Sequence, residues 1–243
     1  TVILSDTPIA EQIICAVDLG INTDAVCSIM KADGTILARK FIDFTSDKDR
    51  MIHAMNRTRR KQSKYGPKSA RSLWAYVKRL NEDRAKKISA AIVEFASQHS
   101  VDAIVMEHLD FKGCKKRGSK AQRLSMWNHG IIREKVEQKA HLLGIRIATI
   151  CAWKTSALAF DGSGSVTRDD NNHALATFTT GKQYNCDLSA SYNIGARYFI
   201  RELIKSLPAT EESRVKAKVP DAGRRTSCTL STLRALVKEL SAA

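Results

Sequence analysis

The chain lacks paired cysteines, long apolar runs and a leader-like N-terminus. Its six cysteines are scattered and none stands in a C-x-x-C pair, which argues against a disulfide framework and favours a reducing compartment. No apolar stretch approaches the roughly 18 residues of a membrane span. No basic segment precedes an apolar one at the N-terminus, so no signal peptide is predicted. A cytoplasmic protein is expected, and Thr1 in place of Met indicates a processed, trimmed or excised chain.

Acidic residues are scarce relative to basic ones. The 243 residues include 25 Asp and Glu against 40 Lys and Arg, which gives a formal net charge of +15. Such a surplus favours a polyanionic partner, because each phosphate contact releases condensed counterions. On charge alone, a protein with solvated basic faces remains the alternative. The length suits one large domain, or one domain with an insert, with a sizeable core.

Apolar periodicity and turn residues predict an alternation of strands and helices. The expected strands span 13–17, 25–30, 35–41, 101–106 and 145–151, and the expected helices span 46–63, 69–99, 123–143, 188–204 and 229–240. Asp33-Gly34 is a hairpin signal, so the first three strands are expected to be antiparallel. Ser46 is the expected N-cap of the first helix. Segments 152–186 and 207–228 are expected to be irregular. This order of elements is typical of the RNase H-like fold.

Three carboxylates stand at the ends of these elements. Asp18 ends the first strand, Glu107 ends the fourth, and Asp187 opens the helix at 188–204. The first and fourth strands of an RNase H-like sheet are parallel neighbours, so the carboxylates are expected to converge. Hard divalent cations, Mg²⁺ or Mn²⁺, would relieve their repulsion, and two ions about 3.5–4 Å apart can support phosphodiester hydrolysis. Singly, each residue could instead be a turn residue, a strand end or a helix cap.

The sequence around these carboxylates resembles the RuvC nuclease domain of TnpB and the type V CRISPR effectors. Residues 16–21 (AVDLGI), 104–109 (IVMEHL) and 184–194 (YNCDLSASYNI) are similar to the three RuvC motifs of that group, in the same order. The resemblance implies that Asp18, Glu107 and Asp187 are catalytic metal ligands.

By the same resemblance, Arg168 supports cleavage as a basic residue. The implied cofactor is a pair of Mg²⁺ (or Mn²⁺) ions, and the implied compartment is a prokaryotic cytoplasm.

Members of that group insert a small target-nucleic-acid-binding module before the third motif. The module opens with Thr-Ser-x-x-Cys-x-x-Cys, and Thr155-Ser156 keeps its beginning. Ala159 and Gly162 occupy the places of the first two cysteines, and the second cysteine pair is missing. A four-ligand zinc site is therefore not expected. The residues expected to hold the module by packing are Phe160, Leu175 and Phe178.

Two basic runs are candidates for nucleic-acid binding. The first contains Arg57, Arg59, Arg60, Lys61 and Lys64, and the second contains Lys115, Lys116, Arg117, Lys120 and Arg123. Aromatic rings beside basic residues stack on the bases of single strands. Trp127 and Tyr65 are candidates for this role, whereas Trp74 and Trp153 are expected to pack internally. His108 follows Glu107 on a strand and should point to the opposite face, away from any metal.

The expected organisation is an α/β, RNase H-like (RuvC) mixed sheet flanked by helices, with a small inserted nucleic-acid-binding module. Its parts are a core at 1–151 with a helical insert at about 46–99 and a lid loop at about 108–123, the module at 152–183, the third motif and its helix at 184–206, and a linker with a C-terminal helix at 207–243.

The resemblance implies a metal-dependent endodeoxyribonuclease that acts on single-stranded or unwound DNA under a guide RNA. Its relatives carry a long N-terminal recognition half, which this sequence does not contain, so that half is expected from a longer polypeptide or another subunit. Two alternatives remain open at this point: a stand-alone RNase H-like resolvase or transposase, and a catalytically silent RNA-guided binding module. No membrane partner is expected.

Overall fold

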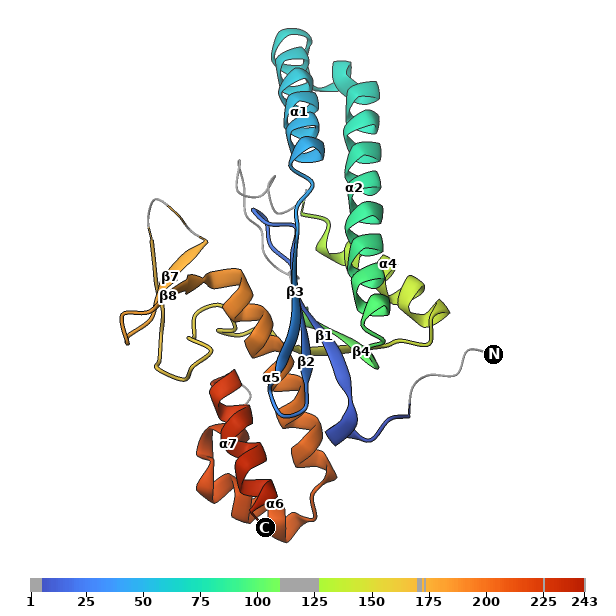
Figure 1. Ribbon diagram of the computed structural model, residues 1–243. Helices are drawn as coiled ribbons and strands as arrows, with labels where there is room; N and C mark the ends of the chain where they lie inside the picture. The colour runs from blue at the N-terminus through green and yellow to red at the C-terminus, as the bar shows by residue number, and fades with distance from the viewer. Residues whose placement is uncertain (1–5, 110–126, 170–171, 173, 225, 243) are drawn as a thin grey trace.

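A five-stranded mixed sheet forms the centre of the computed structural model, which describes residues 6–109, 127–169, 172, 174–224 and 226–242 (Figure 1). The strands are β1 (Ile13–Asp18), β2 (Ala25–Lys31), β3 (Ile36–Ile42), β4 (Ala103–His108) and β5 (Arg146–Cys151), in the spatial order β3-β2-β1-β4-β5. The first three are antiparallel, whereas β4 runs parallel to β1 and to β5. The predicted mixed sheet flanked by helices is confirmed.

Helices cover both faces of this sheet. The longer elements are α1 (Thr45–Tyr65), α2 (Arg71–Gln98), α4 (His129–Leu142), α5 (Cys186–Ser206), α6 (Ala209–Lys218) and α7 (Leu230–Ser241), and the short 3-10 turns are η1 (Ile9–Glu11), η2 (Pro67–Ala70) and η3 (Pro220–Gly223). The side chains of β1 alternate between two cores, as strand geometry requires. Ile14 and Ala16 pack with α5 and α7, whereas Cys15 and Val17 pack with α2 and α4.

The hairpin of α1 and α2 extends beyond the sheet (Figure 1). The two helices share a separate, small core, which Met51, Ala54 and Met55 of α1 form with Val77 of α2. Gly66 separates the two helices with a positive φ of 86°, a conformation that glycine adopts without strain. The long helix α2 then returns to the sheet, and its second half belongs to the central core.

A second, three-stranded sheet lies before α5, in a region (152–186) that had been expected to be irregular. Its strands are β6 (Thr167–Arg168), β7 (Leu175–Thr177) and β8 (Gln183–Asn185). Phe160 contacts Phe178, Tyr184 and Tyr192 edge-on, with ring centroids 4.9–5.5 Å apart. Such contacts stabilise beyond the area that they bury, so this aromatic cluster supplies a core to the small sheet.

Several local expectations were wrong. Segment 207–228 is not a loose linker, because α6 and η3 occupy most of it. Phe44 occupies the N-cap position of α1, and Ser46 lies inside its first turn. Trp127 precedes the first turn of α4, since that helix begins at His129. No helix in the described part of the chain is long and apolar enough to cross a membrane.

Candidate active site

Asp18 and Glu107 are neighbours at one edge of the central sheet. In the parallel pair of β1 and β4, Val17 is paired with Met106, and each of these residues is followed by a carboxylate. The strand positions two residues earlier pack against α5, so both carboxylates belong to the face that α5 covers. Asp187 lies in the first turn of α5, which contacts β1 and β4. Sheet register and helix packing therefore bring the three residues together.

The electrostatics of the site follow from this proximity. Burial raises the pKa of Asp18 well above its ordinary value, the charges of Glu107 and Asp187 raise it further, and Arg168 lowers it. Burial is also the main cause of the raised pKa of Glu107 and of the raised pKa of Asp187. Partly buried carboxylates that repel one another resist ionisation. The arrangement consequently favours a bound cation, or protons where no cation is bound.

The loop between β1 and β2 holds Asp187 in place. A Cβ atom on Gly20 would lie 2.5 Å from the carbonyl oxygen of Thr23, so this tight turn requires glycine. The turn brings Thr23 to the start of α5, where its side chain hydrogen-bonds Asp187 and lowers the pKa of that carboxyl. Asn185 caps α5 by accepting a hydrogen bond from the backbone N–H of Leu188 at 2.8 Å. Asp187 is therefore not the cap of this helix and its side chain faces the site.

Glu107 is held by the segment that follows β5. The Thr155 hydroxyl donates a hydrogen bond to Oε1 of Glu107. The buried side chain of Asn193 donates to the carbonyl oxygens of Thr155 and Leu158, at 3.0 and 2.9 Å. Its own oxygen accepts from the backbone N–H of Leu230 at 3.3 Å. The asparagine of the third sequence motif thus positions the threonine that contacts Glu107.

A buried arginine ties the same region together. Arg197 lies on α5 and only 5% of it is exposed. It donates hydrogen bonds of 2.8–3.2 Å to the carbonyl oxygens of Cys151, Trp153, Thr226 and Cys228. Its charge also lowers the pKa of Glu107. Arg197 therefore fastens the segment after β5 and the segment before α7 to α5, and partly balances the negative charge of Glu107.

Arg168 lies at the site although it comes from the small sheet. It is exposed on β6, and its charge lowers the pKa of both Asp18 and Asp187. Burial raises the pKa of the thiol of Cys186, the residue before Asp187, and the charge of Arg168 lowers that pKa. Arg168 is thus an accessible cation beside the carboxylates, where it can contact an anionic group that approaches them.

The donor set suits a hard divalent cation. Its three members are carboxylates, whose oxygens are the ligands that Mg²⁺ and Mn²⁺ prefer. In the described part of the chain, no group of three or more His, Cys, Asp or Glu side chains, these carboxylates included, is arranged so that it could hold a metal ion as it stands. Two of the carboxylates are instead hydrogen-bonded to the hydroxyl groups of Thr155 and Thr23. The chemistry of the ligands fits the metal.

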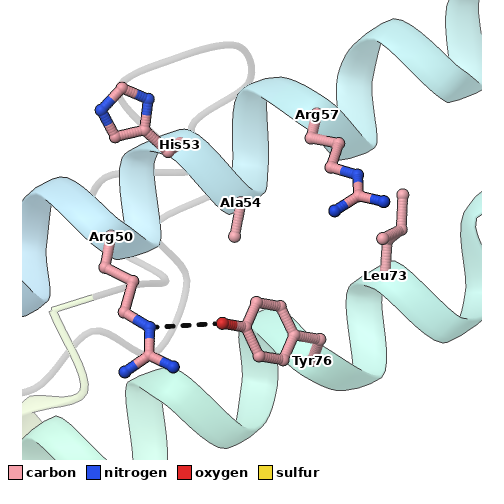
Figure 2. A pocket seen from close by; sticks show the side chains of 6 residues that line it. All are labelled: Arg50, His53, Ala54, Arg57, Leu73 and Tyr76. Carbon is pink, nitrogen blue, oxygen red and sulfur yellow. Dashed lines mark hydrogen bonds between the residues drawn. The ribbon is translucent and has the colours of Figure 1, made fainter.

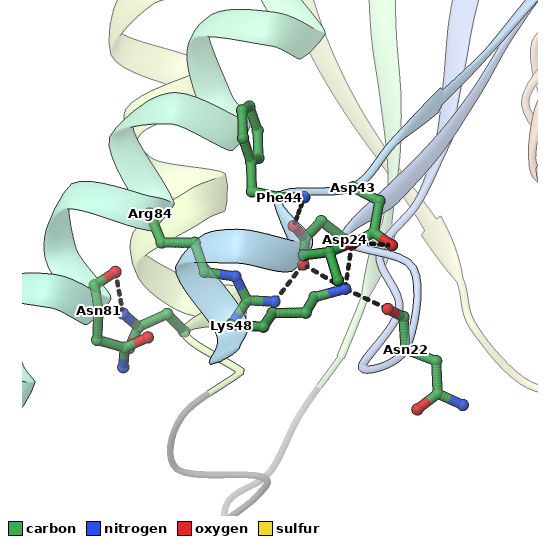
Figure 3. Close-up of polar contacts among 9 residues, drawn as sticks. Asn22, Asp24, Asp43, Phe44, Lys48, Asn81 and Arg84 are labelled. Atoms are coloured by element: carbon green, nitrogen blue, oxygen red, sulfur yellow. Dashed lines mark hydrogen bonds and ion pairs between the residues drawn. The ribbon is translucent and has the colours of Figure 1, made fainter. Parts of the chain in front are cut away.

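A buried network connects the site to the helical hairpin (Figure 3). Asp24 is 1% exposed and pairs with Arg84 of α2 and with Lys48 of α1. Its second oxygen accepts a hydrogen bond from the backbone N–H of Phe44 at 2.8 Å. Lys48 also donates to the carbonyl oxygen of Asn22. The loop that carries Thr23 is therefore fastened to both helices of the hairpin.

The predicted nucleic-acid-binding residues fall into two groups. Arg57, Arg59, Arg60, Lys61 and Lys64 are all exposed on α1. The second group lies outside the described residues, and its members are Lys115, Lys116, Arg117, Lys120 and Arg123. Most of the predicted lid loop lies outside them too.

The four aromatic residues singled out from the sequence differ in exposure. Trp127 is half-buried against the core on the α2 and α4 side, whereas Tyr65 is 64% exposed. Trp153 is 63% exposed, so the expected internal packing of this side chain was wrong, and Trp74 is partly exposed at 36%.

Sequence reasoning missed several residues that shape the site. Thr23, Asp24, Arg84 and Arg197 act through contacts between distant segments, which leave no periodic signal. The signal for Thr155 was present, because Thr155-Ser156 matched the beginning of the small module, but its contact with Glu107 was not inferred.

Comparison with solved structures identifies the fold. The Cas12f1 chain of a complex with sgRNA and target DNA matches with a TM-score of 0.57 and 19% identity, over 78% of this chain and 51% of that one. AacC2c1 in a binary complex with sgRNA matches with a TM-score of 0.56 and 10% identity, over 78% of this chain and 39% of that one. The chain has a RuvC-like fold. It spans about half of the first structure and two-fifths of the second.

Other comparisons add less. RuvC of T. thermophilus in complex with a Holliday junction substrate has a TM-score of 0.43 and 12% identity, over 79% of this chain and 96% of that one. No protein-family model matches the sequence, and no curated protein matches it. The RuvC-like assignment therefore rests on the fold.

Proposed function

We propose that this RuvC-like domain is a metal-dependent DNA endonuclease domain of an RNA-guided nuclease. The observation that carries the proposal is the convergence of Asp18, Glu107 and Asp187 at one sheet edge, with pKa values raised by burial. The fold, shared with proteins solved as sgRNA complexes, is consistent with it. The proposed partners are DNA in single-stranded or unwound form, a guide RNA, and a recognition half or subunit outside this sequence. The proposed setting is a prokaryotic cytoplasm.

Asp18, Glu107 and Asp187 would hold divalent cations, Mg²⁺ or Mn²⁺. Two bound ions would supply an activated water and charge stabilisation at the leaving oxygen. The chain's own part is to orient the carboxylates, through the hydrogen bonds from Thr155 and Thr23. We further propose that residues 152–183 form the small nucleic-acid-binding module, and that its Arg168 contacts the phosphate backbone beside the carboxylates.

Cleavage of end-labelled single-stranded DNA in Mg²⁺ or Mn²⁺ tests the proposal. Wild-type chain, supplied with its recognition half and guide RNA where these are needed, should cut, and Asp18→Ala should fall to background. Asp83→Ala is the control for loss of one acidic side chain, because Asp83 is exposed on α2. Cleavage that persists in Asp18→Ala, or that does not depend on a divalent cation, would refute the assignment.

A further inference from the structure

A cavity of about 500 Å³ lies between α1 and α2, apart from the carboxylates. None of its lining residues belongs to β1, β4 or α5. The residues that line it are Arg50, His53, Ala54, Arg57, Leu73 and Tyr76 (Figure 2). Its volume is within the range of about 300–1,000 Å³ that is typical of small-ligand sites. A single nucleotide is a ligand of suitable size.

The helical repeat explains why basic groups gather here. Arg50 and Arg57 are seven residues apart, about two helical turns, so they share one flank of α1 beside its packed seam, whereas the ring of His53 points away from α2 (Figure 2). Leu73 and Tyr76 are three residues apart on α2 and face this flank. One wall of the cavity is therefore basic, and the opposite wall is apolar and aromatic.

The side chains in the cavity have the chemistry of a phosphate and base site. Nε of Arg50 donates a hydrogen bond to the Tyr76 hydroxyl at 3.3 Å, and Arg57 reaches from α1 into the same space (Figure 2). No carboxylate is among the lining residues. The planar guanidinium group binds phosphate through paired hydrogen bonds, and an aromatic ring beside it offers a surface for a base.

We propose that this cavity binds one nucleotide of a single-stranded segment, with its phosphodiester on Arg50 and Arg57 and its unpaired base against Tyr76. A paired base cannot offer its face to the ring, because neighbouring pairs cover it, so single strands are preferred over duplex. The inference depends on the proposed function only for the class of ligand, a polynucleotide. It assigns a particular contact to part of the exposed basic surface of α1.

Fluorescence anisotropy with the full chain tests the contact. All variants also carry Asp18→Asn, and EDTA is present, so that the probes are not cleaved. The probes are a 15-nucleotide single-stranded DNA, the single-stranded RNA of the same sequence and the corresponding DNA duplex. Arg57→Ala should weaken single-strand binding about tenfold and lower the salt slope by about 1. Arg79→Ala removes the same charge from an exposed position of α2 that does not line the cavity, and should weaken binding less than about twofold.

Variants of Tyr76 distinguish base stacking from general electrostatic attraction to the nucleic acid. Tyr76→Phe keeps the ring, so single-strand affinity should stay within about threefold of the parent, whereas Tyr76→Leu should lose about tenfold with duplex affinity unchanged. A thermal melt of each variant establishes that it is folded. Cross-linking of single strands that carry 5-iodouracil should mark the peptide containing Tyr76, and the better of the DNA and RNA probes identifies the strand.

Two results would overturn the inference. Equal losses in Arg57→Ala and Arg79→Ala would show a diffuse basic face, and equal losses of single-strand and duplex binding in Tyr76→Leu would exclude an unpaired base. These outcomes are independent of the nuclease proposal. Absence of metal-dependent cleavage would refute that proposal while leaving the binding measurements intact.

Discussion

Helix α1 of the helical hairpin and helix α5, which carries the third sequence motif, differ in how much of their surface is buried. α1 exposes a row of cations and buries only four of its 21 residues. α5 has the same length and buries 14 residues, because it lies on four strands of the sheet. The contrast separates adaptable surface contacts on the hairpin from rigid positioning on α5. Asp24 joins the two regions, since it contacts the hairpin and belongs to the loop that holds Asp187 through Thr23.

The largest difference between the regions should appear on removing an arginine from each. Arg197→Ala leaves four carbonyl oxygens without their donor, so we expect a loss of about 3–5 kcal/mol in the free energy of unfolding. Arg57→Ala, on the exposed side of α1, should change it by less than about 0.5 kcal/mol. Chemical denaturation at equilibrium measures both.

Arg201 is the matched control on α5. It lies one turn after Arg197, is partly exposed, and donates to one carbonyl, that of Thr149, at 2.7 Å. Arg201→Ala should cost about 1 kcal/mol. Similar losses in Arg197→Ala and Arg57→Ala would remove the distinction between a rigid and an adaptable region.

Breaking the connection between the regions should have an intermediate effect. Asp24→Asn keeps the shape of the side chain but leaves Arg84 without its counter-ion, and we expect a loss of about 2–3 kcal/mol. Because the loop also carries Thr23, cleavage of DNA should fall although the three carboxylates are intact. The free energy of unfolding, from chemical denaturation, and the rate of DNA cleavage are measured on the same variant.

Two further variants sharpen this test. Asp43→Asn removes an exposed partner of Lys48 and should change stability by less than about 1 kcal/mol. Asp24→Asn combined with Arg84→Met should be less destabilised than the sum of the two single variants, because the unpaired charge is gone. Full cleavage by a destabilised Asp24→Asn protein would show that the network supports only the fold.

The parts that could be predicted from the sequence are those with a local signal. Strand periodicity placed Asp18 and Glu107 correctly, because a period of two and a parallel register determine both position and face. The sequence left Asp187 open as a metal ligand or a helix cap, and only the hydrogen bond from Leu188 shows that Asn185 is the cap of α5. α6 was missed because Val215 is its single buried residue, which leaves no apolar repeat.

Tertiary contacts account for the rest. The buried pair of Asp24 and Arg84 joins residues 60 positions apart, and the contact between Thr155 and Glu107 spans 48 positions. Neither residue pair is distinguished from surface polar residues by local composition. Aromatic packing around Phe160 was expected, but strands of two or three residues are too short to produce a pattern.

The smallest expected effect is a gain of stability at the carboxylate site. Burial and repulsion raise the pKa of Asp18 in the folded chain, so folding binds protons and the fold loses stability as pH rises from the ordinary Asp value, near 4, through the raised one. In EDTA at neutral pH, Asp18→Asn should therefore raise Tm, by roughly 2–4 °C for each kcal/mol recovered. The gain should shrink as pH falls toward about 4, where the carboxyl is protonated in both states.

With divalent cations present, the wild type should have a higher Tm than Asp18→Asn. Mg²⁺ or Mn²⁺ that binds the folded carboxylates stabilises the wild type by mass action, and the Asn variant should respond less. Glu94→Gln is the control, because it removes one exposed negative charge from a chain of net charge +15 and should lower Tm slightly or leave it unchanged. A Tm for Asp18→Asn that falls below the wild type in EDTA would show that Asp18 stabilises the fold, and that the strain of gathering three carboxylates is not stored at this edge of the sheet.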